Sequence, residues 1–243
     1  MYKWGLDSSY GLTGMAEGEF AVQDLTWEIV NKMNLGVELG FLNGMIDLQL
    51  DYFDERRKDI FMPRESVPMT AGFMKQPWKN FGKVTNQGVE VSLNVNKQFG
   101  KDLFVSLMGT FTYAHNEITE KDEPSAVVGT NRAETGHPVG QLTGYIAEGL
   151  FTADDFEDVS TGKLKEGIPT QSFVGKLRPG DIRYRDVNGD GKVDVFDKSP
   201  IGGTKDPEIV YGFGLNMKYK NLDFGALFQG IGRSWNILGS SII

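Results

Sequence analysis

The sequence predicts an all-β protein whose antiparallel strands form a portion of a transmembrane β-barrel. Six segments alternate apolar and polar residues with a period of two, which is the pattern of a β-strand. Tyrosine and phenylalanine gather at the ends of these segments, as they do in the aromatic girdles of membrane barrels. Very short turns alternate with very long connections, which is typical of barrels with short periplasmic turns and long extracellular loops.

Composition excludes several other classes of protein. The 243 residues carry a net charge of −8, which argues against a nucleic-acid binder. There is no cysteine, so disulfides, cysteine zinc sites and thiol nucleophiles are ruled out. No run of apolar residues is long enough for a transmembrane helix, whereas 31 glycines and 16 phenylalanines suit a β-rich chain.

The expected strands form three hairpins. The first joins residues 35–41 to residues 46–52 through Asn43-Gly44, a pair that favours a tight turn because both residues tolerate positive φ. The other two hairpins pair residues 89–95 with 103–113 and residues 211–219 with 222–229. The connections between hairpins are expected to run from Asp54 to Asn86 and from His115 to Glu208.

A barrel with periplasmic turns at Asn43, Gly100 and Asn221 places one face of each strand against lipid. Tyrosines 52, 113 and 211 then lie at the outer interface, and Phe41 and Tyr219 lie at the inner one. The lumen-facing set is expected to be Glu38, Asp47, Asp51, Glu90, Asn94 and Asn216. A soluble sandwich also alternates polar and apolar residues, so periodicity alone leaves that alternative open.

The segment of residues 186–197 fits a twelve-position calcium loop. Carboxylate and amide oxygens at alternating positions suit the hard Ca²⁺ ion, and Gly191 at position 6 allows the sharp turn. The expected ligands are Asp186, Asn188, Asp190, Lys192 (through its backbone carbonyl), Asp194 and Asp197. Position 12 is usually Glu, so Asp197 must approach more closely, as in dockerin-like repeats, which the loop resembles. The alternative is a turn rich in Gly, Asp and Asn that binds no metal.

Catalytic machinery is not visible, and no catalytic residue is predicted. The two histidines, His115 and His137, are expected to be exposed loop residues without clustered partners. The sequence has no Gly-x-Ser-x-Gly motif and no phosphate-binding loop. The chain is therefore not expected to be an enzyme.

Ordered motifs along nearly the whole chain resemble the later barrel strands of SusC/RagA-type TonB-dependent transporters. Residues 25–28 (LTWE) lead into residues 51–53 (DYF), and residues 82–90 (GKVTNQGVE) resemble a strand entry of that family. Residues 144–151 (GYIAEGLF), 179–194 (PGDIRYRDVNGDGKVD) and 211–213 (YGF) continue the likeness in the family's order.

The resemblance implies a function in the outer membrane of a Gram-negative cell. Such proteins import glycans or peptides through a plugged barrel that is driven by TonB and capped by a SusD-like surface lipoprotein. No plug domain or TonB box is visible in this sequence, and six clear strands cannot close a barrel of about 22. We therefore expect residues 1–243 to form part of a larger barrel, with a long extracellular loop region at residues 115–208. The alternative is a secreted soluble β-domain with a calcium loop that binds a partner or glycan.

Overall fold

The computed structural model describes residues 21–22, 24–71 and 75–238, which divide into two compact units. The first unit comprises residues 1–124, 134–139 and 204–243, and the second comprises residues 125–133 and 140–203. No helix in the described part of the chain is long and apolar enough to cross a membrane.

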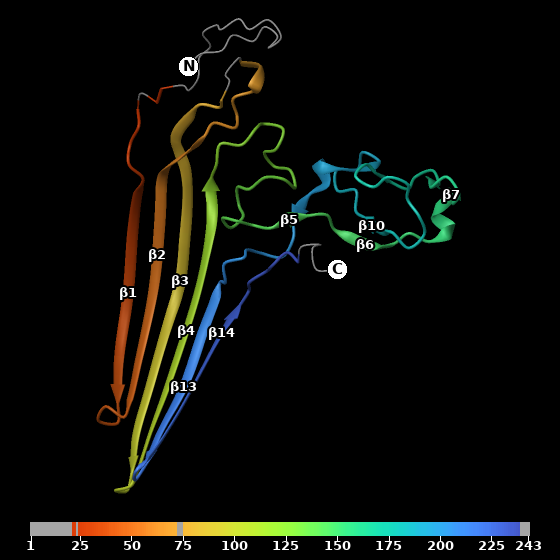
Figure 1. Cartoon of the computed structure of the whole chain (residues 1–243). Helices are drawn as coiled ribbons and strands as arrows, with labels where there is room; N and C mark the ends of the chain where they lie inside the picture. The colour runs from red at the N-terminus through yellow and green to blue at the C-terminus, as the bar shows by residue number, and fades with distance from the viewer. Residues whose placement is uncertain (1–20, 23, 72–74, 239–243) are drawn as a thin grey trace, which may run out of the picture. The chain divides into compact units, whose positions relative to one another are not determined.

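The first unit is built on one antiparallel sheet of six strands (Figure 1). Every strand pairs with the one before it in the sheet, in the order β1-β2-β3-β4-β13-β14. The strands are β1 (Ile29–Phe41), β2 (Ile46–Pro63), β3 (Trp78–Phe99), β4 (Leu103–Glu120), β13 (Ile209–Tyr219) and β14 (Leu222–Gly232). The predicted all-β antiparallel architecture is confirmed.

The strand register separates two faces of this sheet. Residues that pair directly across neighbouring strands lie on the same face. Leu39, Leu48 and Leu93 form one such row, and Glu38, Gln49 and Ser92 form the row of the opposite face. We call the first the apolar face; its rows also hold Leu35, Val37, Phe41, Ile46, Leu50, Tyr52, Val89, Val91, Val95, Leu103, Val105, Leu107, Phe111, Tyr113, Ile209, Tyr211, Phe213, Leu215, Met217, Tyr219, Leu222, Phe224, Ala226 and Phe228.

The apolar face has the height of a bilayer core. On β4 it runs from Tyr113 to Leu103, which is about 34 Å along the strand at about 3.4 Å per residue. A tilt of about 35–45° reduces that length to about 24–28 Å, close to the apolar band of outer-membrane barrels. Phe213 and Phe228 on this face are 53% and 58% exposed, and among the described residues of the sheet only Ile118 is a buried apolar side chain. The face therefore has no protein core above it, unlike that of a soluble sandwich.

All six strands are longer than the sequence pattern predicts, and β2, β3 and β4 are extended the most. β2 continues to Pro63 and β3 begins at Trp78, so their connection spans residues 64–77 and contains a short 3₁₀ turn, η2 (Met69–Ala71). β4 continues to Glu120, and the connection to β13 begins at Lys121 instead of His115. These extensions include apolar residues such as Ile60, Phe61 and Trp78, but apolar and polar residues no longer alternate with a period of two. The hydrogen-bonded ladder therefore continues where the sequence pattern ends.

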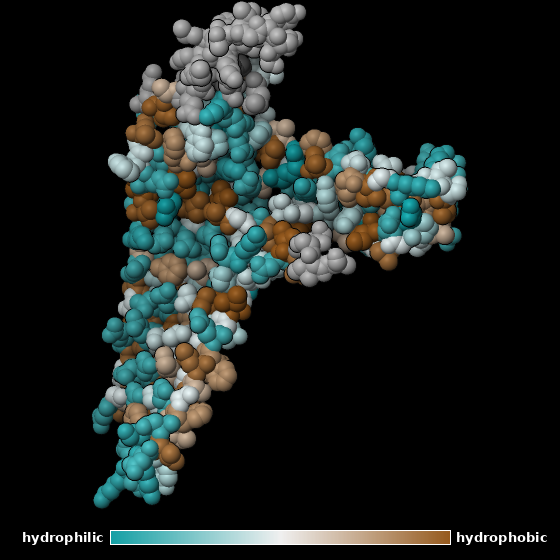
Figure 2. Space-filling view, in the orientation of Figure 1, coloured by the Kyte–Doolittle hydropathy of each residue, from teal (hydrophilic) through white to brown (hydrophobic). Residues whose placement is uncertain are grey.

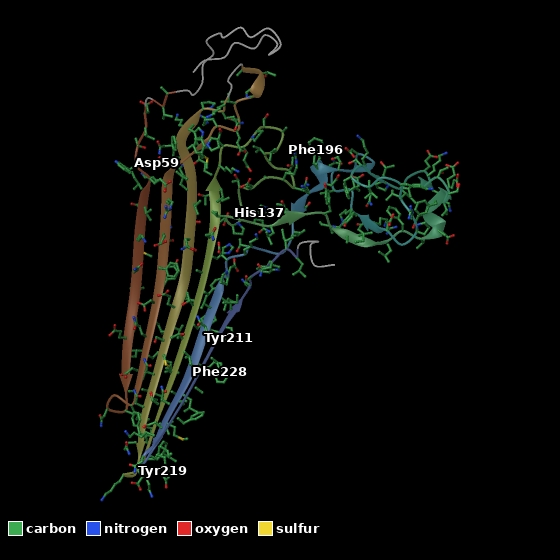
Figure 3. The ribbon with its side chains drawn as sticks, viewed as in Figure 1. Asp59, His137, Phe196, Tyr211, Tyr219 and Phe228 are labelled. Atoms are coloured by element: carbon green, nitrogen blue, oxygen red, sulfur yellow. The ribbon has the colours of Figure 1, made fainter. Side chains whose placement is uncertain are left out.

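A bulge marks the extended part of β2. Asp59 has a φ of 59°, and the β2–β3 register shifts between Arg57 and Ile60. The Asn80 side chain of β3 donates hydrogen bonds to the carbonyls of Asp59 (2.7 Å) and Thr26 (2.9 Å). Figure 3 shows Asp59 at the end of the sheet that is remote from the hairpin turns. One amide side chain therefore holds the bulge against the segment that precedes β1.

The second unit consists of short two-stranded ladders joined by turns. β5 (Thr143–Gly144) pairs with β12 (Ser199–Pro200), and β6 (Ala147–Leu150) pairs with β10 (Ile182–Tyr184). β7 (Phe156–Asp158) pairs with β8 (Lys163–Leu164), and β9 (Thr170–Gln171) pairs with β11 (Lys192–Val193). Two 3₁₀ turns, η3 (Ala153–Asp155) and η4 (Val195–Asp197), complete it. Its small core contains Phe151, Phe156 and Leu177, with the two phenylalanine rings 5.8 Å apart in an edge-to-face contact.

Candidate functional site

The polar face of the six-stranded sheet holds the side chains that the sequence assigns to the barrel lumen. Asp51 pairs directly with Glu90, Asp47 pairs with Asn94, and Glu38 lies in the row between them. Asn216 of β13 pairs with Ser106 on the same face. The register thus brings all six predicted lumen residues, Glu38, Asp47, Asp51, Glu90, Asn94 and Asn216, to one face.

This face offers hydrogen-bonding groups to a polar ligand. A hollow of about 420 Å³ is lined by Glu38, Asp47, Gln49, Ser92 and Asn94, among others. Gln49 donates a hydrogen bond to the Asp51 carboxylate at 2.9 Å. Within the described residues, Glu38, Asp47, Asp51 and Glu90 form no ion pair. This face is therefore a polar, acidic surface rich in hydrogen-bond acceptors. It lies on the opposite side of the sheet from the apolar face.

A polar cluster lies where β4, β13 and β14 leave the apolar band. The Glu208 carboxylate accepts hydrogen bonds from His115 Nδ1 at 2.5 Å and from Arg233 at 3.2 Å. Arg233 also lies 5.6 Å from the centre of the Tyr113 ring. Although burial raises the pKa of Glu208, the hydrogen bonds from His115 and Arg233 bring that pKa below its ordinary value. His115 is thus a strand residue with a carboxylate partner, so the prediction of a loop histidine without partners was wrong for it, although its side chain is 43% exposed.

This cluster could not be predicted from the sequence because its members lie far apart in the chain. Glu208 and His115 are separated by 93 positions and meet only through the pairing of β13 with β4. Arg233 has a φ of 51°, and its carbonyl accepts a hydrogen bond from the Glu208 N–H at 3.3 Å. No local motif encodes such a contact.

The predicted calcium loop lies in the second unit and is closed by hydrogen bonds of its own. Asp197 is completely buried, and its carboxylate accepts hydrogen bonds from the backbone N–H groups of Val187, Asn188 and Asp194 at 2.7–3.3 Å. The Asp186 carboxylate accepts from Gly189 (2.7 Å) and Gly191 (2.8 Å).

The other expected ligands follow the same pattern. Asn188 accepts from the Asp190 N–H, Asp190 accepts from the Lys192 N–H, and Asp194 accepts from the Phe196 N–H. Burial and the charges of Asp194 and Asp197 raise the pKa of Tyr145. In the ranges that the structure describes, no three acidic or histidine side chains are grouped as metal ligands. Backbone amides of the loop thus donate hydrogen bonds to each of these side chains.

Comparison with known proteins identifies the architecture. Residues 4–229 match the family of TonB dependent receptor-like β-barrels. TonB-dependent receptor P3 of Formosa agariphila is 25% identical over 90% of this chain and 22% of its own length. TonB-dependent receptor SusC of Bacteroides thetaiotaomicron is 29% identical over 83% of this chain and 19% of its own. The chain thus spans about a fifth of the length of these relatives.

Solved structures agree on the fold. The RagAB peptide importer in its closed-closed state superimposes with a TM-score of 0.63 at 22% identity. The superposition covers 93% of this chain and 24% of that one. These relatives are named as receptors or as an importer, in keeping with the prediction that the chain is not an enzyme. The family match agrees with the apolar and polar faces of the sheet. The chain belongs to the TonB-dependent receptors of the SusC/RagA type and forms part of their β-barrel in the outer membrane.

Proposed function

We propose that this chain forms part of an outer-membrane importer of oligosaccharides or peptides that is driven by TonB. The observation that carries the proposal is the pairing of a bilayer-high apolar face with an acidic, amide-rich face on the same strands. Carboxylate and amide groups such as Gln49 and Asn94 match the hydroxyl groups of sugars and the amide groups of peptides. The names of two similar proteins, SusC and the RagAB peptide importer, support import.

The partner proteins follow from the same assignment. We propose that a SusD-like surface lipoprotein works with the receptor on the extracellular side, and that TonB acts through another part of the receptor. An affinity-tagged full-length receptor that is extracted from native membranes in mild detergent should co-purify with a surface lipoprotein. Purification of the receptor alone, under conditions in which a SusC–SusD pair from another species stays together, contradicts the partnership.

Uptake by whole cells tests the import function. Cells that lack the full-length receptor should fail to accumulate a fluorescently labelled oligosaccharide or peptide mixture, and dissipation of the proton gradient should abolish uptake by wild-type cells. The double variant Gln49→Ala/Asn94→Ala should reduce uptake by about fivefold or more, because each of the two lost hydrogen bonds contributes about 0.5–1.5 kcal/mol. Val37→Phe on the apolar face is the control, because Val37 does not line this hollow, and it should leave uptake unchanged. Equal uptake with and without the receptor, for both substrate classes, removes the proposal.

Calcium binding by residues 186–197 stays a prediction. Six oxygen donors at positions 1, 3, 5, 7, 9 and 12 support it. The network of backbone amides around Asp186 and Asp197 supports the alternative of a metal-free turn.

A further inference from the structure

Gly109 of β4 leaves an open space on the apolar face. Apart from Gly109 and its two neighbours in the chain, no protein atom lies within 4 Å of the position that its Cβ would take. This is true of no other glycine within the described strands of the six-stranded sheet. By contrast, the Tyr211 ring covers Gly230 and the Met108 side chain covers Gly214. A glycine inside a strand weakens the strand and often marks the close approach of another molecule. The space above Gly109 is therefore available to a molecule outside the protein.

The open space belongs to an apolar groove of about 570 Å³. Its rim includes Leu93, Leu107, Phe213, Leu215, Phe224 and Phe228. The rings of Phe213 and Phe228 stack 4.9 Å apart and form one wall. Leu215 and Phe224 lie between Gly109 and the hairpin turns in the register, so the groove runs toward the turns. Figure 3 shows Phe228 between Tyr211 and Tyr219, which marks the turn end of the sheet.

Lys97 lies on the same face, in the same register row as Phe224 at the turn-side end of the groove. It pairs directly with Val105, whose other neighbour is Met217. Lys97 is exposed and forms no ion pair within the described residues. A lysine on a lipid-facing surface is costly at the bilayer centre and favourable near the headgroups, which its ammonium reaches along the flexible side chain.

Further lysines surround the neighbouring turns. The β3–β4 and β13–β14 turns contact each other, since the Lys220 N–H donates to the Asp102 carbonyl at 2.9 Å. Lys101, Lys218 and Lys220 outnumber the acidic residues there, Asp102 and Asp223, and Lys218 lies 3.9 Å from Asp223. In Figure 2 the tip of the sheet at these turns is mostly hydrophilic, whereas hydrophobic residues appear higher along the strands. The turn end is thus a positively charged rim below a hydrocarbon surface.

We propose that the groove above Gly109 holds an acyl chain of an anionic phospholipid from the periplasmic leaflet, and that the phosphate of this lipid pairs with Lys97. Short turns are periplasmic in outer-membrane barrels, which assigns the leaflet. Leu93, the partner of Gly109, is four residues from Lys97, about 13 Å along the strand. One leaflet contributes about 15 Å of hydrocarbon, so a chain anchored at Lys97 reaches the groove. This lipid site is independent of which substrate the receptor imports.

Native mass spectrometry of the full-length receptor tests the site. The receptor, purified in mild detergent, is mixed with equal amounts of phosphatidylglycerol and phosphatidylethanolamine, and retained lipid is counted. We expect a retained phosphatidylglycerol. Gly109→Leu should lower its retention by about tenfold, because the leucine displaces buried CH₂ groups of the chain. Lys97→Gln should reduce the preference for the anionic lipid by about fivefold.

Matched variants keep the outcome interpretable. Leu39→Phe adds bulk at the same depth on β1, outside the groove, and should retain lipid like the wild type. Ala226→Leu fills the groove from β14 and should repeat the loss if Gly109→Leu does not form a heat-modifiable barrel. Undiminished phosphatidylglycerol on a folded groove-filling variant overturns the proposal. Selective retention of lipopolysaccharide in place of phospholipid overturns it as well, because that lipid belongs to the other leaflet.

Discussion

The six-stranded sheet and the second unit are stabilised in different ways. In the sheet, long backbone ladders are combined with an apolar face that protein does not cover, so the membrane serves as the missing core. In the second unit, ladders of two to four residues surround a small core of Phe151, Phe156 and Leu177, and carboxylates bind backbone amides in successive turns. The stability of the sheet therefore depends on the surrounding lipid, whereas the stability of the second unit depends on its own side chains.

The largest expected effect tests the self-sufficiency of the second unit. Phe151 is 2% exposed and packs against Phe156, so Phe151→Ala should destabilise this unit by about 3–5 kcal/mol. Limited proteolysis of the full-length receptor in detergent should then cleave within residues 140–203 while the strands stay protected. Leu150→Ala, at a residue that is 58% exposed, is the control and should cause little cleavage. Simultaneous loss of the strands would show that the two units depend on each other.

A charge placed on either face of β2 tests the role of the membrane. Leu48→Arg puts a cation near the middle of the apolar band and should destabilise the barrel by about 2–4 kcal/mol. Gln49→Arg, one position along the same strand, faces the acidic hollow and should cost far less. The free energy of unfolding of the full-length receptor in lipid vesicles measures both. Equal losses for the two variants would contradict the assignment of faces.

These faces could be predicted from the sequence, because lipid on one side and water on the other force strict alternation from Ile46 to Tyr52 and from Val89 to Val95. Beyond the bilayer that constraint ends. The strand residues Asp54–Pro63 and His115–Glu120 were therefore assigned to loops. The Glu208 cluster and the open space above Gly109 were not predictable, since both arise from pairing between distant strands.

The link between Arg64 and Asp122, an ion pair at the extracellular end of the sheet, should weaken in acid. Arg64 donates to the Asp122 carboxylate at 2.7 Å, and the Ser66 hydroxyl donates at 3.0 Å. Burial raises the pKa of Asp122, but the hydrogen bonds from Arg64 and Ser66 together lower it by more than burial raises it. The pKa of Asp122 therefore lies below its ordinary value. The link therefore stabilises the fold above about pH 4 and is lost as the pH falls through the lowered pKa.

Removal of the Asp122 carboxylate should destabilise the fold at neutral pH, as acid does in the wild type. Asp122→Ala should cost about 1–3 kcal/mol, because Arg64 loses its partner in a largely buried position. Hydrogen exchange in residues 64–67 measures the local effect, and the variant should no longer respond between pH 5 and pH 3. Glu65→Ala is the control, since its carboxylate lies 3.7 Å from Lys121, beyond hydrogen-bonding distance. An unchanged acid response in the Asp122 variant would place the titrating group elsewhere.

The smallest expected effect decides between an ion and a metal-free turn in the second unit. A loop with the affinity of extracellular calcium modules, about 10⁻⁴–10⁻³ M, gains about 0.4–1.4 kcal/mol at about 1 mM Ca²⁺. Protease cleavage of the full-length receptor near residues 189–193 should then increase after chelation and fall when Ca²⁺ is restored. Asp190→Asn should weaken this response, because Asp190 is exposed and its loss as a ligand leaves the buried Asp197 network in place. If cleavage of the wild type is the same with and without calcium, the loop is stabilised by its backbone amides and not by an ion. The second unit is then stabilised by protein groups alone.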